Sequence, residues 1–200
     1  MKRVFDIIVS FVGLLFLCPV IIVVAGLLKL DGGAIIFKQE RVGRGGSRFQ
    51  LFKFRSMVAD ESKRRIQVTA ENDSRITSLG RLLRKTKLDE LPQLFNVLKG
   101  DMSLVGPRPE VPQYVAMWPE VDRKKILSIR PGITDYATLH YHDEQAILAR
   151  AEDPEKAYVH DIVPHKLELY RDYVRDRNFG LDIRLILATL ARIVNRKGRI

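Results

Sequence analysis

The sequence LDELPQLFNVLKG, residues 88–100, places two adjacent acidic residues directly before a proline and a short apolar stripe. This order predicts a short helix, with Pro92 in its first turn and Gly100 at its C-terminal stop. Asp89 and Glu90 then lie near the helix N-terminus, where unpaired N–H groups and the helix dipole favour an ionised carboxylate. Such a carboxylate can bind a metal or attack an electrophile. Asp89 can also simply cap the helix, and the dipeptide alone leaves both interpretations open.

Four further motifs surround this acidic pair along the chain. They are FKQERVG at residues 37–43, KFRSM at 53–57, GPRP at 106–109 and RPGIT at 130–134, and an apolar segment precedes them all. In this order the motifs resemble the small single-domain type of the monotopic phosphoglycosyl transferases. These are bacterial sugar transferases that prime glycan assembly on a polyprenyl phosphate carrier. The resemblance extends over about residues 1–135.

The resemblance implies a reaction and the residues that carry it. Asp89 would attack the β-phosphate of a UDP-sugar and form a covalent phosphosugar intermediate, with release of UMP. Glu90 would assist metal or proton handling while polyprenyl (undecaprenyl) phosphate accepts the phosphosugar. Two alternatives stay open: a non-enzymatic basic adaptor at a membrane, and a glycosyltransferase that releases UDP.

Phosphate chemistry also sets expectations for a metal and for cationic side chains. Because a carboxylate and a pyrophosphate repel each other, we expect Mg²⁺ between them, with Asp89 as its first protein ligand. The basic residues in or beside the motifs that could grip phosphate oxygens are Lys53, Arg55, Arg84 and Arg108. Pro107 and Pro109 fix the backbone around Arg108 and are assigned to substrate binding, although they can equally serve only a turn.

The N-terminal segment has no charged side chain from Ile7 to Leu28 and is long enough to cross a bilayer as one straight helix. Pro19 lies in its middle, and basic residues on both sides favour the cytoplasm. A helix that breaks at Cys18 and Pro19 and returns to the same face satisfies both charge preferences, and the resemblance implies this re-entrant topology. We therefore expect a re-entrant membrane helix at residues 1–30 and a cytoplasmic catalytic domain at residues 31–200, bound to the bacterial inner membrane in a monotopic manner.

The charge of the chain limits its partners without identifying them. A net charge of +10 and a pI near 9.9 favour nucleic acid, anionic membrane lipids or a phosphorylated substrate. The chain carries no recognised nucleic-acid-binding pattern, so the expected partners are UDP-sugar, polyprenyl phosphate and anionic lipids, and a homo-oligomer is left open. One cysteine excludes an intramolecular disulfide and fits a reducing compartment.

After the N-terminal segment, the sequence predicts a mainly helical α+β fold. The expected elements are strands near 35–37 and 49–54 around a glycine turn, helices over 79–85, 120–128, 161–177 and 181–194, and a strand at 139–142. Thr77 or Ser78 can cap the first of these helices. Residues 59–67 are expected to form a solvated or interfacial helix, and the basic amphipathic helix at 181–194 either covers the core or lies on lipid.

Residues 135–144 depart from the family pattern, in which many members carry a Trp-Ala-Gln run ending in Asn-Gly-Arg. An arginine at that later position cannot be carried over to this chain. We expect the segment to help set the choice of sugar. His140, His142 and Asp143 could instead suggest a metal site, but their spacing lacks a complete ligand set.

Overall fold

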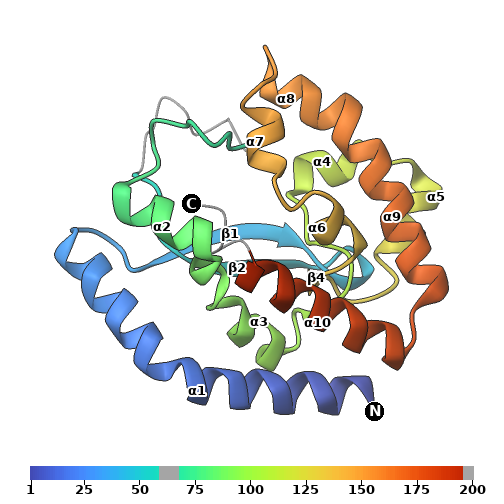
Figure 1. The fold of residues 1–200 in the computed structure, drawn as a ribbon. Helices are drawn as coiled ribbons and strands as arrows, with labels where there is room; N and C mark the ends of the chain where they lie inside the picture. The colour runs from blue at the N-terminus through green and yellow to red at the C-terminus, as the bar shows by residue number, and fades with distance from the viewer. Residues whose placement is uncertain (59–67, 196–200) are drawn as a thin grey trace.

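The computed structural model describes residues 1–58 and 68–195, so the helix expected at 59–67 lies outside the described part. Its fold is mainly helical α+β, as expected (Figure 1). In chain order the elements are α1 (Lys2–Leu30), β1 (Ile36–Val42), η1 (Arg44–Gly46), β2 (Arg48–Phe54), α2 (Ser78–Thr86), η3 (Leu88–Glu90), α3 (Gln93–Lys99), β3 (Ser103–Val105), α4 (Pro112–Ala116), α5 (Glu120–Ile126), β4 (Gly132–Thr134), α6 (Tyr136–His140), α7 (Glu144–Leu148), α8 (Pro154–Ala157), η4 (Tyr158–Ile162), α9 (Val163–Asp176) and α10 (Phe179–Asn195).

The N-terminal helix differs from the sequence prediction at its proline. The predicted break at Cys18 and Pro19 does not end the helix, because α1 continues from Lys2 to Leu30 with Pro19 inside it. Proline removes one backbone hydrogen bond without forbidding helix on either side, and Figure 1 shows that α1 bends partway along. The helix-break-helix is therefore corrected to one bent helix. Among the described residues, α1 is the helix long and apolar enough to cross a membrane.

The first turns of α1 are fastened to the rest of the molecule by polar contacts. Arg3 donates to the carbonyl oxygens of Val97 (2.7 Å) and Leu98 (3.1 Å) at the end of α3. The buried Asp6 carboxylate accepts a hydrogen bond from the Ser103 hydroxyl at 2.8 Å. Since a buried carboxylate is costly without partners, these bonds fix the position of α1 against α3 and β3.

The other end of α1 contacts the same folded unit. Arg55, just after β2, donates to the carbonyl oxygen of Leu28 at 3.1 Å and pairs with Asp31 at 3.0 Å. Leu28 itself is fully buried in a cluster with Phe54 of β2. Between these anchored ends, the apolar side chains of α1 are largely exposed, and Phe16 reaches 82%. Both ends of the apolar helix therefore lie against one domain.

The β1–β2 hairpin confirms the predicted strands and their glycine turn. Its strands pair antiparallel from Ile36 opposite Phe54 to Val42 opposite Arg48. The turn needs backbone conformations with positive φ, and Gly45 adopts a φ of 68° there.

The GPRP and RPGIT motifs meet as neighbours in space. β3 and β4 pair in parallel, with Ser103 opposite Gly132 and Val105 opposite Thr134. A Cβ atom on Gly132 would lie 2.1 Å from the backbone nitrogen of Gly106, so side chains are excluded at this contact. The glycines thus allow two loops to approach more closely than any other residue would permit.

The strand expected at residues 139–142 is wrong, since Leu139 and His140 belong to α6. The Asp135 side chain accepts a hydrogen bond from the Thr138 backbone N–H at 2.7 Å and caps this helix. An N-terminal cap of this kind can initiate even a short helix. The run of β-favouring residues at 139–142 is too short to outweigh the effect of this cap.

The remaining helix predictions are confirmed. Thr77 caps α2 by accepting a hydrogen bond from the Gly80 backbone N–H, and α5 and α9 occupy the expected segments. On α10, Leu185 is buried in the core, whereas Leu187 and Leu190 remain more than half exposed. Of the two alternatives for this helix, covering the core is therefore observed for one of its faces.

The packing of α2 generates a prediction at Gly80. A Cβ atom there would lie 2.0 Å from the carbonyl oxygen of Ser56, so Gly80→Ala must displace α2. We expect the free energy of unfolding to fall by about 1–3 kcal/mol. Gly26→Ala on α1 is the matched control, because no described atom lies within 4 Å of its added Cβ. Thermal unfolding of both variants in detergent measures the difference, and equal stability would contradict the close contact.

Candidate active site

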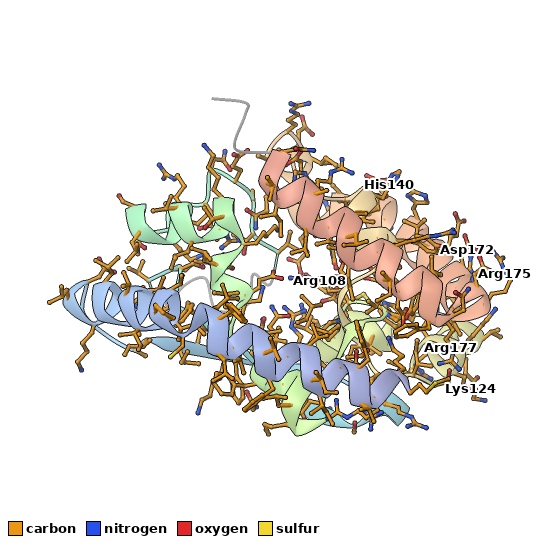
Figure 2. All side chains as sticks on the ribbon, turned by 60° about the horizontal axis from the view of Figure 1, so that its bottom comes forward. Arg108, Lys124, His140, Asp172, Arg175 and Arg177 are labelled. Atoms are coloured by element: carbon orange, nitrogen blue, oxygen red, sulfur yellow. The ribbon has the colours of Figure 1, made fainter. Side chains whose placement is uncertain are left out.

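A cavity of about 1610 Å³ contains most of the predicted site residues. Its lining includes Lys53, Arg55, Arg84, Asp89, Glu90 and Arg108. Figure 2 shows Arg108 in the middle of the molecule, between α1 and α10 in that view, whereas Arg175 and Arg177 lie where α9 meets α10. The structure therefore brings together motifs that are far apart in the sequence.

The acidic pair lies in the short turn η3 and not in the first turn of α3. Lys87 adopts a left-handed conformation (φ 60°) between α2 and η3, and Pro92 precedes α3 with no side-chain cap. Asp89 therefore does not cap α3, which removes the simplest structural explanation for it. Its side chain is buried (6% exposed), and Oδ1 has no hydrogen-bond partner among the described residues.

Glu90 organises the cationic side chains of the cavity. Its carboxylate accepts hydrogen bonds from Arg108 Nη2 at 2.5 Å and Nη1 at 3.2 Å, and from Lys53 Nζ at 3.2 Å. Burial alone would raise the pKa of Glu90, but Arg108 and then Lys53 hold that pKa well below its ordinary value. Because such a carboxylate stays ionised at neutral pH, the geometry favours a role in positioning charge over a role in proton handling.

Asp89 has the opposite electrostatic environment. Burial raises the pKa of Asp89 from its ordinary value and the charge of neighbouring Glu90 adds to this rise, while Lys53, Lys87 and Arg84 lower it. These cations, and not the expected dipole of α3, favour the ionised carboxylate. A buried anion with an unsatisfied oxygen gains free energy from any bond to a metal ion or an electrophile. In the acidic pair, Glu90 is therefore occupied by its two cationic partners, whereas Asp89 keeps an oxygen that can bind a ligand.

Arg84 and Arg55 both line the cavity but have different hydrogen-bond partners. Arg84 projects from α2, and the Gln145 amide oxygen accepts hydrogen bonds from its guanidinium once the amide is oriented to satisfy both residues. Arg55 lines the cavity as well, but its guanidinium is bound to the end of α1. Its observed contacts are structural, whereas Arg84 lies beside the acidic pair.

The two prolines flanking Arg108 hold its loop through backbone hydrogen bonds outside the cavity. The Pro107 carbonyl accepts a hydrogen bond from the Gly132 N–H at 3.0 Å, and the Pro109 carbonyl accepts one from Arg41 at 3.1 Å. The Arg108 backbone N–H donates to Asp135 at 3.3 Å. Neither proline lines the cavity, so their observed role is to hold the loop.

Asp135 was missed from the sequence, although it directly follows the RPGIT motif. It is completely buried, and its carboxylate joins the Arg108 loop to the first turn of α6. Burial raises its pKa, and the hydrogen bond from the Thr138 backbone opposes that shift. A carboxylate that bonds to two backbone segments fixes their separation, so Asp135 is a positioning residue for Arg108.

A second buried charge network on the cavity wall was also missed. Lys166 of α9 pairs with Glu144 of α7 and lies 4.8 Å from the centre of the Tyr158 ring. The Tyr158 hydroxyl donates to Glu110, which pairs with Arg41 at 2.9 Å. Only Arg41 belongs to one of the sequence motifs. The other partners are joined by the fold across long sequence separations, which no local pattern reveals.

The structure limits where a metal could bind. Within residues 1–58 and 68–195, no group of three or more His, Cys, Asp or Glu side chains is arranged to hold a metal ion. The metal site considered at His140, His142 and Asp143 is therefore not formed. Instead, the His140 ring packs against the His165 ring at 4.7 Å. The available Asp89 oxygen fits a cation that takes one protein carboxylate and completes its coordination with phosphate and water.

Comparison with known proteins agrees with the motifs. A family model described as bacterial sugar transferase matches residues 1–196. The UDP-glucose:undecaprenyl-phosphate glucose-1-phosphate transferase of Xanthomonas campestris pv. campestris is 37% identical over 200 residues, covering 98% of this chain and 39% of that protein. The UDP-N-acetylgalactosamine-undecaprenyl-phosphate N-acetylgalactosaminephosphotransferase of Aeromonas hydrophila is 34% identical over 202 residues, covering 98% and 44%. The chain thus spans less than half the length of these relatives.

The charge balance around Glu90 predicts a large effect of its removal. Glu90→Gln leaves the partly buried Arg108 and Lys53 (side chains 31% and 21% exposed) without their counter-charge, and we expect the free energy of unfolding to fall by about 1–3 kcal/mol. Glu40→Gln is the matched control, because Glu40 pairs with Arg48 on the surface (side chains 43% and 65% exposed) and should change stability by about 0–1 kcal/mol. Chemical denaturation in detergent compares the two. Similar effects would contradict a central role for Glu90.

Proposed function

The chain belongs to the bacterial sugar transferase family, and we propose that it transfers a sugar 1-phosphate from a UDP-sugar to undecaprenyl phosphate and releases UMP. The activities for which its relatives are named support this reaction. The observation that carries the proposal is the buried Asp89 carboxylate with an unpartnered oxygen, beside cations held in place by Glu90. The relatives differ in their sugar, so the sugar of this chain stays open.

We propose that the transfer proceeds through a covalent intermediate on Asp89. An Asp89 oxygen attacks the β-phosphorus, the bond from that phosphorus to the bridging oxygen breaks, and UMP leaves with that oxygen. An oxygen of undecaprenyl phosphate then attacks the same phosphorus and releases the Asp89 carboxylate. Arg108 and Lys53 would neutralise phosphate charge in both steps, and positioned charge supplies most of the catalysis in phosphoryl transfer.

We propose Mg²⁺ as the cofactor, with Asp89 as its protein ligand. The ion would supply additional positive charge at the pyrophosphate. One available carboxylate is sufficient, because Mg²⁺ usually retains waters and also binds substrate phosphates. Glu90 fits this role less well, since its oxygens already accept from Arg108 and Lys53.

We propose that the protein is monotopic, with α1 re-entering the cytoplasmic face of the bacterial inner membrane. Two observations support this topology. Both ends of α1 bind the same domain, through Lys2 with Asp182 (2.5 Å) at one end and Asp31 with Arg55 (3.0 Å) at the other. The apolar side chains between them are exposed. The net charge of +10 would add attraction to anionic lipid headgroups.

The two alternatives explain fewer of the observations. An adaptor would need the charge and the apolar helix, but it has no use for an unsatisfied buried carboxylate in a cation-lined cavity. A glycosyltransferase would use similar substrates but would release UDP. The identity of the nucleotide product therefore separates the nearest enzyme alternative from our proposal.

The proposed nucleophile gives a direct test. Asp89→Asn removes the attacking oxygen anion while preserving size, and we expect UMP release to fall about a thousandfold or more. Asp172→Asn is the control, because Asp172 pairs with Arg175 on the surface of α9, far from Arg108 in Figure 2. UMP is measured with UDP-sugars and undecaprenyl phosphate, together with labelling of the protein by a β-³²P donor. Near-normal UMP release by folded Asp89→Asn protein would exclude the proposed nucleophile.

The topology has an independent test. Lys2→Cys and Asp31→Cys, each made in a Cys18→Ser background, place one thiol at either end of α1. We expect a membrane-impermeant thiol reagent to label both positions only after the cytoplasmic side is opened, because both ends bind the same domain. Labelling on opposite sides would establish a helix that crosses the membrane.

A further inference from the structure

The cavity has an apolar region in addition to its charged end. That region is lined by side chains from α1, α3, α6 and α10, namely Leu17, Leu94, Leu139, Ile186, Leu190 and Ile193. Lys53, Asp89 and Arg108 line the same cavity, so the two regions are continuous. In Figure 2, Arg108 is seen between α1 and α10, the two helices that contribute Leu17 and the α10 residues.

One face of α10 forms much of the apolar wall. Ile186, Thr189, Leu190 and Ile193 all line the cavity and are spaced i, i+3, i+4 and i+7, which places them on one side of a helix. The Thr189 hydroxyl lies 2.5 Å from that of Thr134 and so attaches this face to the end of β4. The face is therefore held in a defined position, yet Leu190 remains 54% exposed.

The nucleotide sugar does not account for this wall. Its phosphates, ribose and sugar hydroxyls need polar partners, and they lose hydration without compensation against leucine and isoleucine. A prenyl phosphate, in contrast, matches both regions of the cavity: its phosphate matches the cationic end, and its hydrocarbon chain matches the apolar wall. Leu17 extends the lining to α1, so the cavity borders the helix that we place in the membrane.

We infer that the cavity-facing side of α10, formed by Ile186, Leu190 and Ile193, binds the isoprenoid chain of the acceptor together with Leu17 of α1. The acceptor phosphate then lies at the Asp89 end, and the chain leaves between α1 and α10 toward lipid. This inference rests on the proposed function, because it assigns a binding site to the acceptor of that reaction. It also gives the exposed Leu190 side chain a ligand.

A pair of variants on the same helix tests the inference. Leu190→Gln places a polar side chain in the proposed chain site, whereas Leu187→Gln makes the same change at a residue of similar exposure (60%) that does not line the cavity. Turnover is measured in detergent with undecaprenyl phosphate and with geranyl phosphate, whose short chain makes fewer contacts. We expect the preference for the longer acceptor, as a ratio of kcat/KM, to fall about tenfold in Leu190→Gln and to hold in Leu187→Gln.

A second measurement does not depend on turnover. A prenyl phosphate carrying a benzophenone in its chain is photo-crosslinked to the wild-type protein, and we expect the modified peptide to include residues 186–193. Equal loss of acceptor preference in both leucine variants, no loss in either, or crosslinks confined to other segments would overturn the inference. Absence of UMP release by the wild type with every UDP-sugar and acceptor would instead overturn the proposed function, so the two failures are distinguishable.

Discussion

The partly buried ion pairs of Glu90 are the interaction on which the site depends. They join three parts of the chain: Lys53 from the hairpin, Glu90 from the turn after α2, and Arg108 from the loop after β3. Bringing two cations together in a partly desolvated cavity is unfavourable unless an anion compensates for them, so the Glu90 carboxylate stabilises this arrangement. Asp89 then has cations close by without itself being neutralised in an ion pair. Two adjacent carboxylates thus differ in role because their partners differ: Glu90 forms ion pairs, and Asp89 keeps an oxygen without a hydrogen bond.

The position of Arg108 is fixed by contacts of its own loop with the loop before β4 and with Asp135. Gly106 and Gly132 let two loops touch where no side chain could fit, and Asp135 connects the Arg108 backbone to the start of α6. Prolines on either side of Arg108 add rigidity. The divergent segment 135–144 is therefore connected to the cationic centre through its first residue. Changes in that segment can alter the cavity wall while the position of Arg108 is preserved by a buried carboxylate.

The sequence predicted those features whose causes are local or belong to a recognised motif. Thr77 as a cap, the glycine turn of the hairpin, and the convergence of Lys53, Glu90 and Arg108 are of this kind. It failed where a distant or competing contact decides the outcome. The segment that was predicted to be a strand forms α6, which the Asp135 side chain caps. Helix α1 continues through Pro19, because one lost hydrogen bond is tolerated in a long helix. The pairing of Lys166 with Glu144 joins residues that are 22 positions apart in the sequence, which short-range patterns do not encode.

The attachment of α1 has a consequence for how the protein is made. Arg3 and Asp6 bind Val97, Leu98 and Ser103, which leave the ribosome long after α1 has emerged. During that interval these polar groups lack the partners that they have in the folded protein, and domains form from chain that has already been synthesised. The docking of α1 therefore waits until the residues that bind its first turns have been made. Synthesis thus imposes an order on folding, in which the long apolar helix exists before its binding site does.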